Sequence, residues 1–275
     1  MFAYPPPQPL PQGGDGRAAA GLRAGGWLVV RDMSSAGAGI LSQLRSQLPP
    51  PPGDASYAGR RAAQRRYREA ACRLLAPVVE HRMTLRDARP IGFLPDLYPE
   101  LQSFVLPFIQ LQELHGAYGR YREGVHLAVL GHRVHPFYGT YVPTRVSHLE
   151  LFGTWLSGYK GPRKRAVDVG TGCGVLALML AKAGFERVLA TDCNPNALES
   201  LARDMGRMSS PPKIDLWHGD LLGEDSSRRD LIVFNPPWIQ GEIDDLLDRS
   251  LHFEEGLFER FFDQAIERLN PAGRI

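Results

Sequence analysis

The chain has 275 residues, and its fractions of hydrophobic (43%) and charged (23%) residues are those of an ordinary globular protein, which excludes a wholly disordered chain. No apolar run reaches about 18 residues, so we expect no transmembrane helix and no membrane partner. The net charge of +2 is unevenly distributed, because residues 1–166 hold 21 basic and 11 acidic residues and residues 167–275 hold 11 and 19. A basic first part before an acidic second part suggests an acidic partner.

Three cysteines, Cys72, Cys173 and Cys193, are too few and too scattered for a disulfide framework or a four-ligand zinc site. The histidines show no metal-ligand spacing either, so we expect no metal. Reduced thiols are typical of the cytoplasm, which is the predicted location. Import into an organelle stays open, because acidic residues are sparse near the N-terminus.

Residues 1–55 contain nine prolines and nine glycines. Proline lacks an amide donor and glycine is costly to order, so this segment is predicted to be a disordered N-terminus. Whether residues 1–32 belong to the protein stays open, because Met33 could be the true start.

Residues 56–142 are predicted to form a helical segment followed by a β-hairpin, and they are a candidate substrate-recognition domain. An arginine-rich stretch up to Leu75 indicates a helix, and prolines divide residues 91–115 into short helices. The hairpin is expected at residues 125–135. The basic helix face is either a solvated surface or a surface that meets RNA or the ribosome.

Residues 143–275 alternate between buried strands and helices. Strands are predicted at 166–169, 187–191, 214–217 and 231–234, and helices at 149–156, 175–183, 195–208 and 254–269. This alternation predicts an α/β domain with a mainly parallel, doubly wound sheet. Residues 270–273 are interpreted as the turn before a fifth strand, so the sheet is expected to be incomplete at the C-terminus.

A glycine-rich loop, Asp168-Val-Gly-Thr-Gly-Cys-Gly174, joins the first strand of this domain to the next helix. Glycine lets such a turn adopt strained dihedrals and approach a ligand closely. A dinucleotide-binding fingerprint requires glycine or alanine three residues after Gly172, where this chain has Val175. The spacing favours a cofactor whose methionine-like part lies across the loop over a bound pyrophosphate.

Two further acids follow the next two strands. Asp192 lies 22 residues after Gly170 and is placed to accept both ribose hydroxyl protons. Asp220 follows the third strand and is a candidate partner of an adenine amino group. Each acid alone could be a turn former. Ligands of open α/β sheets bind at the carboxyl ends of the strands, so the acids and the loop together predict one nucleoside site.

The fourth strand ends in Asn235-Pro236-Pro237-Trp238. Two consecutive prolines make a rigid turn without amide donors, and this turn presents the Asn235 side chain and the Pro236 carbonyl as acceptors. Two fixed acceptors can hold the hydrogens of a planar –NH2 group, and Trp238 can stack on a flat π system. The turn alone could also be a structural strand exit with a core tryptophan.

These motifs resemble the class I S-adenosylmethionine-dependent methyltransferases that modify amino groups, including the release-factor glutamine methyltransferases and the methyltransferase small-domain families. The resemblance rests on "VDVGTGCGVLALMLA", "ATDCNPNAL" and "NPPW", with a weaker likeness of "HRVHPFYGTYVPTRVSHLELF" to the lead-in of the glutamine methyltransferases. It implies a Rossmann-like fold and N-methyl transfer to a glutamine amide or to a nucleobase amine. The expected partner is accordingly a release factor, a ribosomal protein or an RNA.

The resemblance also implies a set of site residues. The cofactor-binding residues would be Asp168, Gly170, Thr171, Gly172, Gly174, Asp192, Asp220, Leu221 and Asn235. The catalytic residues would be Asn235, Pro236, Pro237 and Trp238. Two other hypotheses stay open. One is a non-catalytic protein that binds S-adenosylmethionine or RNA, and the other is a nicotinamide-dependent oxidoreductase.

Overall fold

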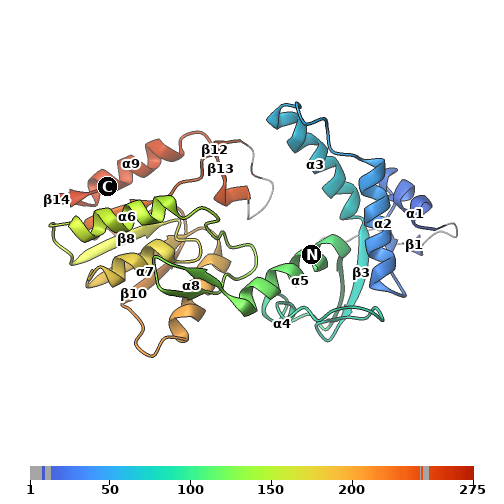
Figure 1. The fold of residues 1–275 in the computed structure, drawn as a ribbon, viewed down its shortest axis with the longest axis horizontal. Coiled ribbons are helices and arrows are strands. Elements are labelled where there is room, and N and C mark those ends of the chain that lie inside the picture. The colour runs from blue at the N-terminus through green and yellow to red at the C-terminus, as the bar shows by residue number, and fades with distance from the viewer. Residues whose placement is uncertain (1–7, 10–13, 242, 244–247) are drawn as a thin grey trace. The chain divides into compact units, whose positions relative to one another are not determined.

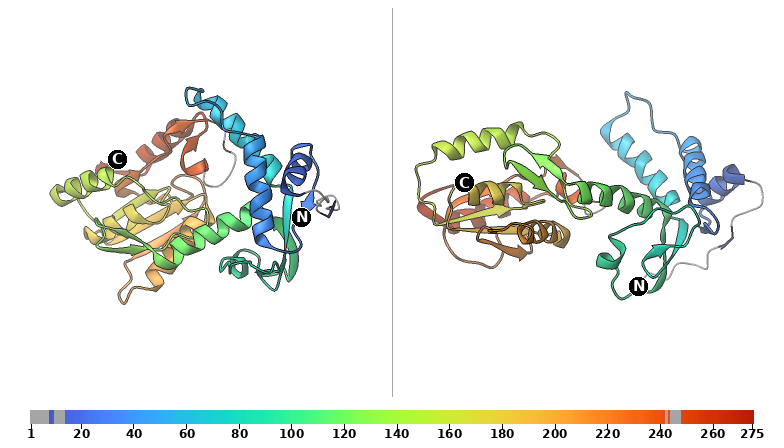
Figure 2. Two further views of the ribbon diagram at one scale, coloured as in Figure 1. Left: turned by 45° about the vertical axis from the view of Figure 1, so that its right-hand side comes forward. Right: turned by 60° about the horizontal axis from the view of Figure 1, so that its bottom comes forward.

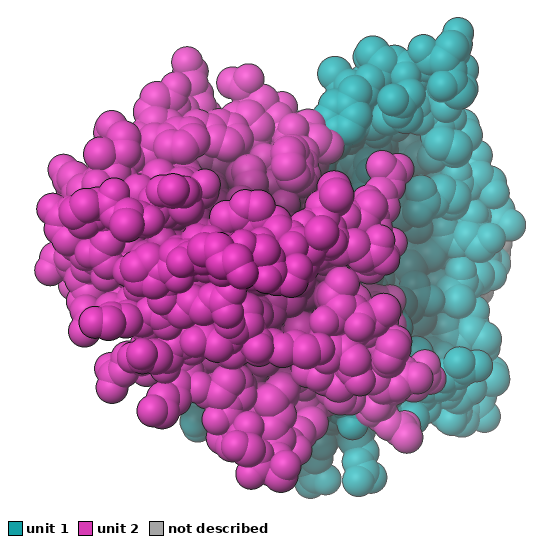
Figure 3. Space-filling model, turned by 60° about the vertical axis from the view of Figure 1, so that its left-hand side comes forward, with its two compact units in different colours: residues 1–118 teal, residues 119–275 magenta. Residues whose placement is uncertain are grey.

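The computed structural model describes residues 8–9, 14–241, 243 and 248–275 (Figure 1). The chain divides into two compact units, residues 1–118 and residues 119–275 (Figure 3). Helix α5 (Phe108–Glu123) begins in the first unit and ends in the second. Each unit has a sheet of its own. Within the described residues, no helix is long and apolar enough to cross a membrane.

The sheet of the first unit is built around strand β3 (Leu74–Val79), which pairs with three neighbours. Its first three residues, Leu74, Leu75 and Ala76, are fully buried, as a central strand requires. The other strands are β1 (Gln8–Pro9), β2 (Leu28–Val29), β4 (Arg82–Met83) and β5 (Ser103–Pro107). The helices besides α5 are α1 (Gly14–Arg23), α2 (Ser34–Gln47), α3 (Tyr57–Ala71) and α4 (Leu94–Leu97).

The N-terminal 55 residues differ from the prediction of disorder. Residues 1–7 and 10–13 lie outside the described residues, but residues 14–47 form α1, β2 and α2. Helix α1 packs on α2, and Leu22 and Leu44 are fully buried. The prolines lie before α1 and after α2, so they interrupt neither helix, and averaging the composition over the whole segment hides their buried apolar faces.

The boundary and the strand content of the next segment also differ from the prediction. The predicted hairpin exists as β6 (Val125–Leu127) and β7 (His132–Val134), but it belongs to the second unit, which begins at residue 119 and not near 143. Residues 103–107 form strand β5, where short helices were expected. Pro107 occupies the last position of that strand, and prolines are tolerated at such positions.

The second unit confirms the predicted α/β class with a parallel sheet (Figure 2). Its five strands have the order β10–β9–β8–β11–β14, and every pair is parallel. The strands are β8 (Arg165–Val169), β9 (Arg187–Asp192), β10 (Ile214–His218), β11 (Arg229–Phe234) and β14 (Leu269–Arg274). The helices are α6 (Ser147–Gly158), α7 (Val175–Lys182), α8 (Pro195–Gly206) and α9 (Leu257–Glu267).

Residues of β8 alternate between two cores, one on each face of the sheet. Ala166 belongs to the core formed with α6, α7 and α8, whereas Val167 and Val169 belong to the core formed with α9. Successive side chains of a strand point to opposite faces, so Asp168 lies on the α7 side. The chain order reverses between β8 and β11, and this is where ligands bind in such sheets.

Residues 270–273, which were interpreted as a turn, lie inside strand β14. The register against β11 is irregular, since Arg229 pairs with Leu269 and Leu231 pairs with Arg274. Proline cannot donate to a sheet, and Pro271 falls within this irregular stretch. The asparagine, proline and glycine therefore mark an irregular stretch within strand β14, and not a turn that precedes it.

Candidate functional site

The glycine-rich loop begins where β8 ends. Gly170, Gly172 and Gly174 all have positive φ values, of +64°, +54° and +82°, which glycine adopts without steric cost. A Cβ on Gly172 would lie 3.5 Å from the carbonyl oxygen of Tyr141, and a Cβ on Gly174 would lie 2.5 Å from a methyl of Leu201 on α8. The third glycine is therefore required by the packing of α7 against α8.

Asp168 and Thr171 brace this loop from beneath. The Thr171 hydroxyl and the Ala177 amide donate to Asp168 Oδ2 at 2.6 and 2.9 Å, which ties the loop to the first turn of α7. Complete burial raises the pKa of Asp168 to about 7, despite these two hydrogen bonds. Its Oδ1 is buried without a partner in the structure.

Asp192, the last residue of β9, connects the loop to helix α8. Its Oδ2 accepts the Gly172 amide at 2.9 Å and its Oδ1 accepts the Asn194 amide at 2.8 Å. Burial raises the pKa of this carboxyl, and the two amide donors oppose that rise. Because a carboxylate already occupies the Gly172 amide, this donor is not available to a phosphate.

Asp220 and Leu221 follow the end of β10. Leu221 is buried and adopts φ +51°, and its carbonyl accepts the Thr191 hydroxyl at 2.6 Å. Asp220 is largely exposed, and one of its oxygens lies 3.5 Å from a guanidinium nitrogen of Arg260 on α9. This carboxylate is thus available at the cavity mouth.

The Asn-Pro-Pro-Trp turn follows β11, and hydrogen bonds at its C-terminal end hold it in place. The amides of Trp238 and Ile239 both donate to the Leu251 carbonyl, at 3.1 and 3.0 Å. Strands β12 (Ile239–Gln240) and β13 (His252–Phe253) continue this pairing. Trp238 is 73% exposed, so it is not the core tryptophan of a structural strand exit.

One cavity brings most of the predicted site residues together. Its lining includes Gly170, Thr171, Gly172, Asp192, Asp220, Leu221, Asn235, Pro236, Pro237 and Trp238. Asp168 and Gly174, predicted to bind the cofactor, do not line it, because Asp168 is enclosed beneath the loop and Gly174 faces Leu201. We interpret both as supports of the loop.

The cavity is also lined by residues that were not among the predicted site residues. Gly139, Tyr141 and Pro143 come from the segment between the hairpin and α6, and Cys193 and Asn194 follow β9. The residues of the segment after the turn are Arg249, Ser250, Leu251, His252, Phe253 and Glu254. Asn194 carried a local signal, because Asn before Pro is typical of a helix N-cap. Gly139, Tyr141 and Pro143 lie in the stretch that was likened to the lead-in of the glutamine methyltransferases.

The cysteines near the cavity are unsuited to nucleophilic chemistry. Burial raises the pKa of the Cys173 thiol to about 12, and burial together with the Asp192 carboxylate raises the pKa of Cys193. Only a thiolate is a good nucleophile. Both residues therefore act as small packing residues.

Residues 154–275 match the family model of the methyltransferase small domain. This part of the chain is similar to that family. The match agrees with the resemblance to the methyltransferase small-domain families that the sequence motifs indicated.

Three curated proteins illustrate the range of the relatives. A putative protein N5-glutamine methyltransferase of Methanocaldococcus jannaschii is 29% identical over 90 residues, which cover 33% of this chain and 45% of that protein. A tRNA1(Val) (adenine(37)-N6)-methyltransferase of Porphyromonas gingivalis is 30% identical over 122 residues (41% and 48%). A ribosomal protein L11 methyltransferase of Pelotomaculum thermopropionicum is 39% identical over 80 residues (29% and 26%). The chain thus spans less than half the length of these relatives.

The geometry of the cavity fits S-adenosylmethionine. At Gly170 the nearest atom to an added Cβ is on the Phe234 ring, 3.5 Å away, so the loop leaves open space beside an aromatic surface. Asp192 and Asp220 offer carboxylate oxygens, which suit ribose hydroxyls and an amino group and would repel a pyrophosphate. The residues present therefore suit an adenosyl group with a cationic methionine portion better than a dinucleotide.

Proposed function

We propose that this protein is an S-adenosylmethionine-dependent N-methyltransferase that acts on a planar –NH2 group, either a glutamine amide or the exocyclic amine of a nucleobase. The observation that carries the proposal is the shared cavity. Asn235 and Pro236 line it together with Asp192 and the glycine loop, so an acceptor-binding turn and a nucleoside site meet in one place.

The protein's own part in this reaction is binding and orientation. S-adenosylmethionine supplies, when bound, a methyl group activated by a positively charged sulfur. Asp192, Asp220 and Leu221 would hold the adenosyl portion, and the loop from Gly170 to Gly172 would hold the methionine portion. Holding the reactants in line supplies most of the rate gain in such a transfer, and no protein nucleophile is needed.

Asn235 and Pro236 would orient the acceptor nitrogen. The side-chain oxygen of Asn235 and the carbonyl oxygen of Pro236 each accept one N–H of the –NH2 group, which directs its lone pair toward the methyl group. These acceptors would hold both hydrogens while the nitrogen lone pair forms the bond to the methyl carbon and the methyl–sulfur bond breaks, which would leave S-adenosylhomocysteine. The methylated nitrogen would then lose one of its two protons to solvent. The rigid diproline keeps both acceptors in place before the substrate arrives.

Trp238 would contact the acceptor at the cavity mouth. It is 73% exposed, and an exposed indole provides a flat surface for a base or an amide plane. An exposed platform suits an acceptor presented by a macromolecule. The names of the relatives, which mention protein glutamine, ribosomal protein L11 and a tRNA adenine, support a protein or an RNA as that macromolecule. The cytoplasm, where ribosomal proteins and tRNA occur, is the proposed location.

The test is transfer of a tritiated methyl group from S-adenosylmethionine to separated RNA, ribosomal-protein and release-factor fractions. Label in one fraction, dependent on the protein, is the expected result and identifies the acceptor class. Calorimetry with S-adenosylhomocysteine and with NAD runs in parallel. Cofactor binding without transfer to any fraction would favour the non-catalytic alternative, and binding of NAD alone would favour the oxidoreductase.

A further inference from the structure

We propose that helix α8 positions residues 135–141, here called the wall segment, as one side of the cavity, and that Asn194 is the positioning residue that joins this wall to Asp192. The inference rests on the proposed function for the identity of the ligand. The wall segment precedes the segment matched by the family model, residues 154–275, whereas Asn194 and α8 lie inside it. Gly139 and Tyr141 of the wall segment line the cavity.

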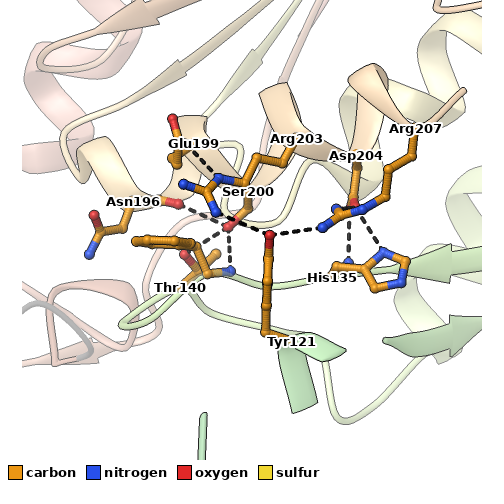
Figure 4. A network of polar contacts seen from close by, with 10 residues as sticks. Tyr121, His135, Thr140, Asn196, Glu199, Ser200, Arg203, Asp204 and Arg207 are labelled. Carbon is orange, nitrogen blue, oxygen red and sulfur yellow. Dashed lines mark hydrogen bonds and ion pairs between the residues drawn. The ribbon is translucent and has the colours of Figure 1, made fainter. Parts of the chain in front are cut away.

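Polar side chains along one side of α8 hold the wall segment over its length (Figure 4). The contacts are His135 with Asp204 at 2.8 and 2.9 Å, the Phe137 amide with Ser200 at 2.8 Å, Thr140 with Ser200 at 3.1 Å, the Tyr138 carbonyl with Asn196 at 2.9 Å and the Gly139 carbonyl with Asn194 at 2.9 Å. Asn196, Ser200 and Asp204 are spaced by four residues, which places them on one helix face. The segment therefore runs antiparallel to the helix and is bonded to it repeatedly.

The contacts of Ser200 with the wall segment are buried, and those of Asp204, Asn196 and Asn194 are partly buried. Ser200 is fully buried, and Asp204 and Asn194 are 4% and 7% exposed. The Ser200 hydroxyl donates to the Asn196 carbonyl at 2.8 Å and accepts a hydrogen bond from the Phe137 amide. It is thus satisfied both as a donor and as an acceptor. Loss of such a partner leaves a buried donor unpaired, and this costs more than an exposed hydrogen bond would.

Asn194 connects the wall to the nucleoside side of the cavity. Its backbone amide donates to Asp192, its Oδ1 caps α8 by accepting the Asn196 amide at 3.0 Å, and its Nδ2 donates to the Gly139 carbonyl. Asp192 in turn holds the Gly172 amide. One residue thus fixes the wall, the acid and the glycine loop relative to one another.

The decisive variant is Asn194→Ser. Serine is as good an N-cap as asparagine and carries no charge, and its backbone amide can still donate to Asp192, but its side chain is too short to reach the Gly139 carbonyl. We expect S-adenosylhomocysteine to bind about three- to tenfold more weakly by calorimetry, the effect of one net hydrogen bond. In the cofactor-free protein, we expect faster hydrogen exchange in peptides covering residues 137–141. Ser200→Ala is the second variant, with the same two expectations.

The matched control is Glu199→Gln, which lies on the same helix. Glu199 is half-exposed and bonds to Arg203 at 2.6 Å, but it makes no hydrogen bond to the wall segment. Arg203 lies over the Phe137 ring and also donates to the Tyr121 hydroxyl, and we expect it to keep both contacts in this variant. An ion pair with a half-exposed partner contributes little to stability, so binding and exchange should match the wild type within about twofold.

The outcomes separate this proposal from the proposed function. Unchanged exchange in both Asn194→Ser and Ser200→Ala overturns the proposal that α8 positions the wall segment. Faster exchange with unchanged binding overturns the wall's role at the cavity. The wild type could also bind neither S-adenosylmethionine nor S-adenosylhomocysteine while exchange is still faster in the two variants. In that case the proposed function fails, and the positioning of the wall segment by α8 stands.

Discussion

Asn235 stands at the exit of a buried strand, where two prolines follow it and no amide donor competes for its side chain. In the proposed reaction Asn235 does not take up the proton that the methylated nitrogen loses, and it forms no covalent bond. It fixes the direction of a lone pair. Its substitution therefore distinguishes orientation from binding, because the adenosyl portion of the cofactor would be held by other residues, Asp192 and Asp220.

Asn235→Ala is expected to lower kcat by roughly 10²–10³, the effect of removing one preorganised transition-state hydrogen bond. Binding of S-adenosylhomocysteine should change by less than about threefold. Single-turnover methyl transfer and calorimetry measure the two quantities separately. Intact turnover would mean that the turn is only a strand exit and that an oxygen, carbon or sulfur nucleophile accepts the methyl group.

Asp168 should make a pH-dependent contribution to the free energy of unfolding, and a neutral variant can isolate it. Its pKa is raised from 3.8 to about 7 by burial, so the folded state binds more protons than the unfolded state between those values. Stability from this residue is therefore full at low pH and is lost as the pH rises through about 7. The neutral variant Asp168→Asn should lack this contribution.

The measurement is denaturant unfolding of the wild type and Asp168→Asn at several pH values from 5 to 8, without cofactor. The free energy of unfolding of the variant, relative to the wild type, should increase with pH. A difference that stays constant across this range would show that Asp168 is ionised in the folded protein throughout.

At the scale of elements, the glycine loop divides its work between the cavity and the core. Gly170 lines the cavity and Gly174 starts α7, although both have positive φ. The sequence presents them as one motif with one role. The structure separates them, because only the position of a Cβ on Gly174 collides with a buried residue of α8.

Gly174→Ala and Gly170→Ala make a matched pair. Both pay about 1–2 kcal/mol for alanine in a left-handed conformation. Gly174→Ala should lose roughly 1–3 kcal/mol more, because its Cβ would lie 2.5 Å from a Leu201 methyl. Urea denaturation gives both free energies, and calorimetry should show the larger loss of cofactor affinity in Gly170→Ala. Equal losses of stability in the two variants would argue against the packing role.

At the scale of the whole molecule, two units with separate sheets and cores should unfold in two steps. S-adenosylhomocysteine should raise the Tm of the transition that belongs to residues 119–275, since a ligand stabilises only the unit that binds it. Leu44→Ala removes a fully buried side chain from the first unit. It should lower the free energy of unfolding of that unit by about 2–5 kcal/mol, and so lower the Tm of the other transition. Scanning calorimetry checks both. A single transition that responds to both changes would show that the units unfold together.

The sequence by itself determined the parallel sheet and the half of the site that follows its strands. Gly170, Asp192 and Asn235 each come directly after or at the end of a buried strand, and parallel strands bring such positions to one edge. The N-terminal unit could not be predicted, because its prolines and glycines dominate the composition while its buried residues depend on distant partners: Gly37, for instance, lies against Phe108. The wall of the cavity was decided only by the tertiary structure. Asn194 and Gly139 are 55 residues apart in the chain, and no local pattern marks a bond between a side-chain amide and a distant carbonyl.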